Sequence, residues 1–328
     1  MTACHDSTRD SNMTGLCQAS DGKGYPRPKL TNEREYAVLM YTLRRRNLAR
    51  NTELVSKQLE KVTGSDLNLP YSEGNTALMY AIDAGNTAVA FQLISRMSDE
   101  ALDLANKDGD TALTYAVRQY TLPWPKHVTA RLLEICRILI PRMSQKAIDQ
   151  KNKKGKTALY IAIGNWVFYG AKATELCLEL IHRMSQKAIR DVGPDGQTPL
   201  AQAAAHGASK ICFALIPLMG TEDIDRADCE GNTALSTAIA RVNAVRAGGI
   251  LHKVHQDALI RVCLKLISLM STEPISRTNE RGESAADLAI EDGITEVLLE
   301  LIFRVATISE AKRHQFALGF IQKAKSVH

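Results

Sequence analysis

Six stretches of the chain share one pattern of apolar and polar positions. In each stretch a Leu-Ile pair lies inside a nine-residue run, and apolar residues fall at positions i, i+1, i+4 and i+5. This spacing places the apolar side chains on one side of an α-helix. The pattern therefore predicts six amphipathic helices, each with one buried face. The six runs are residues 89–97, 135–143, 176–184, 211–219, 262–270 and 297–305.

A second, shorter phrase precedes every run. It begins with Gly, continues through a polar residue to Thr or Ser, and leads into a short Ala-rich segment. The polar turn with Gly is followed by a hydroxyl that can cap a helix. The phrase therefore predicts a turn and a short first helix ahead of each apolar run. The six glycines are Gly74, Gly109, Gly155, Gly196, Gly231 and Gly282.

A phrase that recurs every 35 to 51 residues is typical of stacked units that bury their apolar faces against one another. We therefore predict an all-α solenoid of helix-turn-helix units with short hairpin loops and a helical cap at both ends. Asn32 and Glu35 resemble a capping box, and a second helix of this N-terminal cap is expected from Thr52 to a stop at Gly64. The predicted divisions are a polar, disordered segment at 1–30, the N-terminal cap at 31–65, six repeats at 66–306 and the C-terminal cap at 307–328.

The repeats resemble those of the ankyrin repeat family. Gly196, Thr198, Pro199, Leu200 and Gly207 match the family pattern best, and the resemblance covers about residues 66 to 305. The sequence departs from the pattern in three ways: Ala replaces Pro in most units, the usual His after Leu is absent, and the period is longer than usual. The resemblance implies a repeat solenoid that acts as a scaffold for protein–protein interaction, without a cofactor.

The long period is similar to that of ankyrin proteins of intracellular bacteria, some of which are injected into host cells. This closer resemblance implies an alternative function, a secreted effector translocated into a host cell. An effector of this kind could carry a small catalytic site built by the insertion at 242–255, with His252, His255 and Cys229 as its parts.

Composition indicates a packed protein that folds in a cytosol. Of 328 residues, 45% are hydrophobic and 23% are charged, as in ordinary globular proteins. No apolar stretch approaches the ~18 residues of a membrane helix, and the first 20 residues lack the apolar core of a secretory signal. We interpret the basic runs at 44–46 and 151–156 as solvated, because no motif for nucleic-acid recognition accompanies them. The expected partner is therefore a protein rather than a nucleic acid, and we expect a monomer.

Four of the seven cysteines share one repeat position, which Ala90 and Leu298 occupy in the other units. A position that accepts Ala, Cys or Leu is a packing position, and the wide spacing does not suit a zinc site. We therefore predict no metal site and no catalytic residue. Cys229 falls near a hairpin tip and is expected to be exposed. The four cysteines of the shared position are Cys136, Cys177, Cys212 and Cys263.

Three units carry extra residues between their two helices, at 120–128, 166–172 and 242–255. Both tryptophans of the chain lie in these insertions, Trp124 between two prolines and Trp166 close to Tyr169. The aromatic side chains either pack on each other or anchor a partner, because Trp and Tyr are common at interface hot spots.

The resemblance also places the variable positions of the first helices in a concave groove. These positions change from unit to unit while the apolar positions do not, which suits a recognition surface. Together with Trp124, Trp166 and Tyr169, the predicted partner-binding residues are Tyr80, Asp83, Tyr115, Arg118, Gln119, Asn165, Gln202, His206 and Arg241.

Overall fold

A computed structural model describes residues 30–45, 51–119, 124–166, 170–246, 250–291 and 293–306. These residues form helices joined by turns, with isolated β-bridges at three hairpins. They group into two compact units, the first reaching Ser144 without residues 120–122, and the second starting at Gln145. Each unit is described by itself. None of the described helices is long and apolar enough to cross a membrane.

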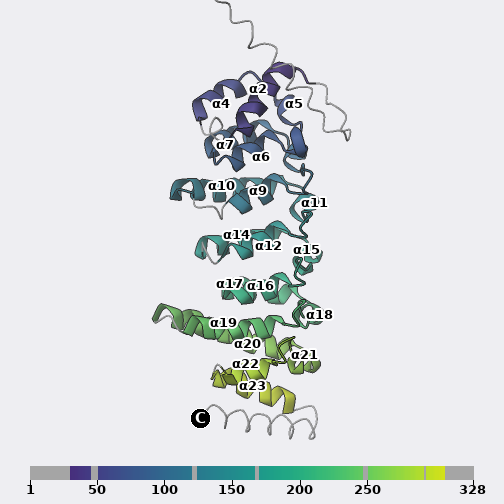
Figure 1. Cartoon of the computed structure of the whole chain (residues 1–328), viewed down its shortest axis with the longest axis vertical. Helices are drawn as coiled ribbons and strands as arrows, with labels where there is room; N and C mark the ends of the chain where they lie inside the picture. Colours follow the sequence, from purple (N-terminus) through teal and green to yellow (C-terminus); the bar gives the residue numbers. More distant parts are fainter. Residues whose placement is uncertain are drawn as a thin grey trace, which may run out of the picture. The chain divides into compact units, whose positions relative to one another are not determined.

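The first unit is a stack of helix pairs (Figure 1). In each pair a first helix packs on a second, and both pack on the corresponding helices of the next pair. A short helix follows two of the second helices. The elements are α2 (Glu33–Arg44), α4 (Thr52–Leu59), α5 (Gly64–Leu67), η1 (Ser72–Gly74), α6 (Ala77–Asp83), α7 (Thr87–Arg96), α8 (Asp99–Leu102), α9 (Ala112–Gln119) and α10 (Lys126–Arg142).

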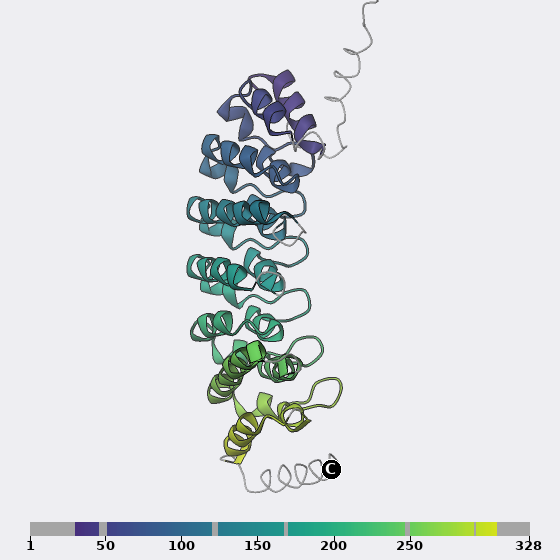
Figure 2. The ribbon, with the colours of Figure 1, turned by 90° about the vertical axis from the view of Figure 1, so that its left-hand side faces the viewer.

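The second unit repeats this arrangement, and its hairpin loops project to one side in Figure 2. The predicted all-α fold of stacked helix pairs is confirmed. The elements are α11 (Gln145–Ile148), α12 (Ala158–Gly164), α14 (Ala171–Arg183), α15 (Gln186–Arg190), α16 (Pro199–His206), α17 (Ser209–Leu215), η2 (Ile216–Leu218), α18 (Thr221–Ile224), α19 (Ala234–Arg246), α20 (Ile250–Leu269), α21 (Thr272–Ser276), α22 (Ala285–Glu291) and α23 (Thr295–Ala306).

The repeated glycine and hydroxyl have the roles that the sequence predicts. All six glycines have a positive φ of 71–81°, which a residue with a Cβ rarely adopts. The hydroxyl that follows accepts a hydrogen bond from the backbone N–H three residues later and so caps the first helix. The capping residues are Thr76, Thr111, Thr157, Thr198, Thr233 and Ser284.

The apolar runs form the core of both units. The Leu of each Leu-Ile pair is fully buried, and so are the four cysteines of the shared repeat position. The predicted packing role of these cysteines is therefore confirmed. Burial raises the pKa of the Cys177, Cys212 and Cys263 thiols, to about 12 in Cys263. Such thiols stay protonated and unreactive at neutral pH, whereas Cys229 is exposed at a hairpin tip.

Two local predictions were wrong. Gly64 does not end a helix but begins the short helix α5, because Thr63 accepts a hydrogen bond from the Asp66 N–H and caps it. Residues 242–246 and 250–255 do not lie between two helices, where the sequence predicted them. They lengthen α19 and α20, because this insertion contains no helix-breaking proline. The predicted segment 1–30 (apart from Leu30) and the predicted cap at 307–328 lie outside the described residues.

At four places among the described residues, the short helix after a second helix is followed by a link to the next repeat. An Asn or Asp that follows it accepts a hydrogen bond from a serine N–H one repeat later, at 2.8–3.0 Å. Where both short helices belong to one unit, that serine begins the next short helix and the bond helps to position it. The pairs are Asn68 with Ser98, Asp103 with Ser144, Asp149 with Ser185, and Asp225 with Ser271.

An arginine near the end of the second helix forms another link. Arg142 donates to the carbonyl oxygens of Ile94 and Met97 at 2.5 and 2.9 Å, and pairs with Asp99 at 2.7 Å. These carbonyls end α7 and have no partner within that helix. Arg96 makes the same kind of contact with the carbonyls of Leu59 and Val62, and Arg304 with that of Met270.

Candidate partner-binding surface

A stacked Tyr-Arg pair lies on α9 in the first unit. The guanidinium of Arg118 lies 4.3 Å from the centre of the Tyr115 ring. Its Nη1 donates to Oδ2 of Asp110 at 2.6 Å, and the Asp110 side chain is only 4% exposed, while that of Arg118 is 42% exposed. The Tyr115 hydroxyl donates to Oδ1 of Asn75 at 3.2 Å. The pair is therefore half-exposed and held in place on both sides.

Burial raises the pKa of Tyr115, and the nearby Arg118 charge opposes that rise only in part. The phenol therefore stays protonated and remains a hydrogen-bond donor over the physiological pH range. Together the two side chains present an aromatic ring and a cation, which is the chemistry of protein-interface hot spots.

The neighbouring predicted residues support this pair rather than extend it. Gln119 is buried, and its Nε2 donates to Oδ1 of Asp83 at 2.7 Å. The Tyr80 hydroxyl donates to the Ser72 carbonyl at 3.1 Å and is half-buried. Asp83 and Tyr80 thus reach the surface only in part, and Gln119 acts as a link between α9 and α6.

Trp124 packs on the previous repeat of its own unit. A Cβ added to Gly85 would lie 2.7 Å from Cη2 of the indole, so the ring covers this glycine, whose φ is 72°. Trp124 is half-buried. Its first role is therefore to close the end of α6, and only the remaining part of the ring is available to a partner.

In the second unit the predicted residues lie deeper than expected. Asn165 and Gln202 are each 8% exposed. The indole Nε1 of Trp166 donates to the Thr174 hydroxyl at 2.9 Å, which ties the end of α12 to α14. Tyr169 lies outside the described residues. Since Trp124 and Trp166 belong to different units, the two expectations for the aromatic insertions, mutual packing and partner anchoring, both remain.

His206 ends α16, and Arg241 lies close to it, in the middle of α19. Arg241 passes over Gly207, where an added Cβ would lie 3.4 Å from its Nε. Burial, and secondarily the Arg241 charge, lowers the pKa of His206. Arg241 occupies the repeat position that Gln119 has in the first unit, but Ala205 stands where Asp83 would be. Its buried Nε has no hydrogen-bond acceptor.

Sequence reasoning missed the contacts made by the hairpin tips. An Asn or Asp side chain accepts the N–H groups two and four residues later and so shapes the tip, at Asn106, Asn152, Asp228 and Asn279. Backbone bonds then join neighbouring tips, as from the Cys229 N–H to the Asp195 carbonyl at 3.1 Å. The recurrence of Asn or Asp three residues before the glycine was the available signal.

Tyr160 shows how such a tip is fixed. Its hydroxyl donates to both carboxylate oxygens of Asp195, at 2.6 and 2.8 Å, and its ring would clash with any Cβ at Gly193. This is the position where the family pattern has His, and here Tyr links α12 to the next hairpin.

Of the parts of the expected catalytic alternative, the structure describes the side chains of Cys229 and His255, whereas that of His252 lies outside the described residues. Cys229 is exposed at its hairpin tip, and His255 is exposed on α20. Among the described residues, no three His, Cys, Asp or Glu side chains are grouped as around a metal ion.

Comparison with known families agrees with this geometry. Residues 32–122 match the sequence model of a family described as ankyrin repeats (3 copies). This part of the chain is therefore similar to ankyrin repeats. The match begins within the predicted N-terminal cap, where α2, α4 and α5 have the layout of a repeat. Ankyrin repeats generally mediate protein–protein interactions. No curated protein matches the chain.

Several solved structures resemble the chain. The ankyrin repeat protein EF0377 has a TM-score of 0.48 at 23% identity, over 70% of this chain and 98% of that one. The ankyrin repeat domain of Bcl-3, a member of the IkappaB protein family, has a TM-score of 0.45 at 18% identity. The match covers 81% of this chain and 96% of that one. A chain in the complex of the predatory endopeptidase Bd0816 from Bdellovibrio bacteriovorus with the immunity protein Bd3460 has a TM-score of 0.44 at 21% identity. The match covers 71% of this chain and 97% of that one.

Proposed function

We propose that the protein is a non-catalytic scaffold that binds a partner protein through the first helices and hairpin tips of its repeats. The stacked Tyr115–Arg118 pair is the observation that carries this proposal. Its side chains are of the types that dominate interface hot spots, and both are partly exposed. The contacts with Asp110 and Asn75 hold them in place before any partner arrives.

Prior ordering matters because binding normally costs about 0.5–1.5 kcal/mol for each flexible side chain that becomes immobilised. Arg118 has lost most of that freedom in the free protein, since its ion pair ends on a buried carboxylate. The pair therefore suits a partner that offers a carbonyl or carboxylate to the guanidinium and an apolar group to the ring.

A matched pair of double variants tests the proposal. The first, Tyr115→Ala with Arg118→Ala, removes the stacked pair. The second, Tyr41→Ala with Arg45→Ala, removes another Tyr-Arg contact, 4.8 Å long, which lies at the end of α2 and includes none of the predicted partner-binding residues. Affinity purification with mass spectrometry should recover a partner with the native chain and with the second variant, but not with the first.

Both variants are first checked for an unchanged helical spectrum and unfolding midpoint. Equal recovery of the partner by the two folded variants would remove Tyr115 and Arg118 from the interface and would overturn the proposal.

A further inference from the structure

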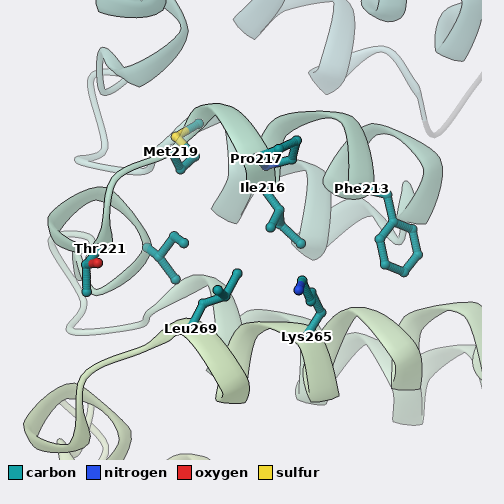
Figure 3. A pocket seen from close by; sticks show the side chains of 8 residues that line it. Phe213, Ile216, Pro217, Met219, Thr221, Lys265 and Leu269 are labelled. Atoms are coloured by element: carbon teal, nitrogen blue, oxygen red, sulfur yellow. The ribbon is translucent and has the colours of Figure 1, made fainter.

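The second-helix side of the second unit contains an apolar pocket (Figure 3). It has a volume of about 500 Å³ and lies between α17 with η2 on one side and α20 on the other. Its lining includes Phe213, Ile216, Met219, Lys265 and Leu269. In Figure 3, Phe213 lies at one end of the pocket and Thr221 at the other, so the opening follows the two helices.

The pocket forms where the arginine link between repeats is missing. Leu269 occupies the position that Arg142 has in α10. By the same alignment, Ile216 and Met219 correspond to Ile94 and Met97, whose carbonyls Arg142 binds. Leucine has no donor for such carbonyls and is shorter than arginine. The space and the apolar surface that arginine fills or covers elsewhere are therefore left open here.

The rim of the pocket is unusually apolar for a protein surface. Phe213 is 43% exposed and Leu269 is 36% exposed, and these are two of only four large apolar side chains exposed among the described residues. The other two, Leu299 and Phe303, lie on α23. Exposed apolar clusters around a cavity of this size are typical of binding sites.

The charges on the α17 and α20 sides of the pocket are mostly positive. Lys265 lines it, and Arg261 lies one turn earlier on the same face of α20. Lys210 lies one turn before Phe213 on α17, which has no acidic residue. The acids on these two sides are limited to Asp257, two turns from Lys265. The far end, at α18, carries Glu222, Asp223 and Asp225, of which Asp223 pairs with Arg190 and Arg226, and Asp225 accepts a hydrogen bond from the Ser271 N–H.

We propose that this pocket is a second protein-binding site, and that its occupant is an amphipathic helix with apolar anchor residues flanked by Asp or Glu. The apolar anchors would fill the space beside Leu269 and cover Phe213, as in other helix-in-groove complexes. The acidic residues would lie over Lys265, Arg261 and Lys210. This site is separate from the Tyr115–Arg118 surface and does not depend on the function proposed for it.

A designed peptide tests the proposal with the full chain. The acidic probe is a fluorescent helix of about four turns with Leu on one face and Glu on both flanks. The basic probe has Lys in place of Glu, and a third probe has Ser in place of Leu. Fluorescence anisotropy should show binding of the acidic probe, with affinity about tenfold or more above that of either other probe.

Variants of the chain then locate the site. Leu269→Arg restores the missing arginine and should weaken binding of the acidic probe by about tenfold or more, and Phe213→Ser should do the same. Lys265→Glu should shift the preference towards the basic probe. Leu299→Ser is the matched control, because Leu299 holds the repeat position of Phe213 and is 61% exposed outside the pocket. It should leave binding unchanged.

Unaltered binding in folded Leu269→Arg and Phe213→Ser variants would overturn the proposal, and so would equal affinity for the acidic and basic probes. A photoreactive benzoylphenylalanine at position 213 distinguishes the acidic probe from other occupants of the pocket. Crosslinks to the acidic probe support the site. Crosslinks formed instead to residues 307–328 of the same chain, or to a second copy, would show that another segment already fills the pocket.

Discussion

Two junctions between repeats are built from equivalent helices but differ in the side chains that link those helices. Where α6 and α7 meet α9 and α10, Gln119 binds Asp83 on the first-helix side, and Arg142 binds three groups on the second-helix side. Where α16 and α17 meet α19 and α20, Arg241 and Leu269 hold these two positions. There Ala205 replaces the acid, and an apolar pocket replaces the arginine contacts.

This difference shows that the apolar stripe and the polar links are separable. Both junctions have the same buried Leu-Ile core, so both stack. The polar links decide what remains on the surface. The first junction is closed and leaves a stacked Tyr-Arg pair exposed beside it, whereas the second leaves apolar surface on one side and a buried, unpaired guanidinium nitrogen on the other.

The largest expected effect comes from converting the closed junction into the open one. Arg142→Leu places the residue of the second junction in the first and removes the bonds to two α7 carbonyls and to Asp99. Hydrogen bonds from charged donors contribute about 1.5–3 kcal/mol to stability. Because the Arg142 side chain is partly exposed, we expect the free energy of unfolding to fall by about 2 kcal/mol. Urea unfolding should show that loss, with faster hydrogen exchange at the ends of α7 and α10.

Arg304→Leu serves as its control. The bond from Arg304 to the Met270 carbonyl, at 3.5 Å, is longer than either bond from Arg142 to a carbonyl, so we expect a smaller loss. Equal losses for the two variants would mean that the Arg142 bonds do not set the stability of the closed junction.

A smaller effect should follow from giving the open junction its missing acid. Ala205→Asp places a carboxylate where Asp83 lies in the first unit, within reach of Arg241. We expect a gain of about 0.5–1 kcal/mol in the free energy of unfolding, since the site is partly exposed and lies at a helix C-terminus, where an acid is disfavoured. The gain should vanish when Arg241 is changed to Met. A gain that persists in that double variant would contradict an ion pair between the introduced carboxylate and Arg241.

The smallest expected effect is a dependence on pH at the same junction. Burial and the Arg241 charge lower the pKa of His206 in the folded chain. The unfolded chain then binds more protons, so the stability that this histidine contributes is complete above its unfolded pKa of about 6.5 and is lost as the pH falls below it. The free energy of unfolding should therefore depend less steeply on pH in His206→Gln than in the native chain, between about pH 7 and pH 5. An unchanged slope would show that His206 is not responsible.

Much of the fold could be predicted because it depends on local spacing. A Gly that adopts a positive φ, a hydroxyl that caps the next helix, and an apolar stripe each lie within a few residues, so their recurrence predicted the units and the buried cysteines. The candidate surface was less predictable. Gln119, Asn165 and Gln202 have the polarity of surface residues, yet they are buried. Gln119 binds Asp83, and Gln202 lies against Gly164, both in the preceding repeat.

The sequence by itself determined the repeat unit, its helix pair and its capped turn, because those depend on residues close together in the chain. Only the tertiary structure decided which side chains remain exposed. Contacts between repeats join residues 30 to 50 positions apart, as Arg142 reaches Ile94 across 48 residues and Tyr160 reaches Asp195 across 35. Whether residue 269 closes the junction between two repeats or leaves a pocket depends on the backbone carbonyls of the neighbouring helix. No local sequence pattern specifies where those carbonyls lie.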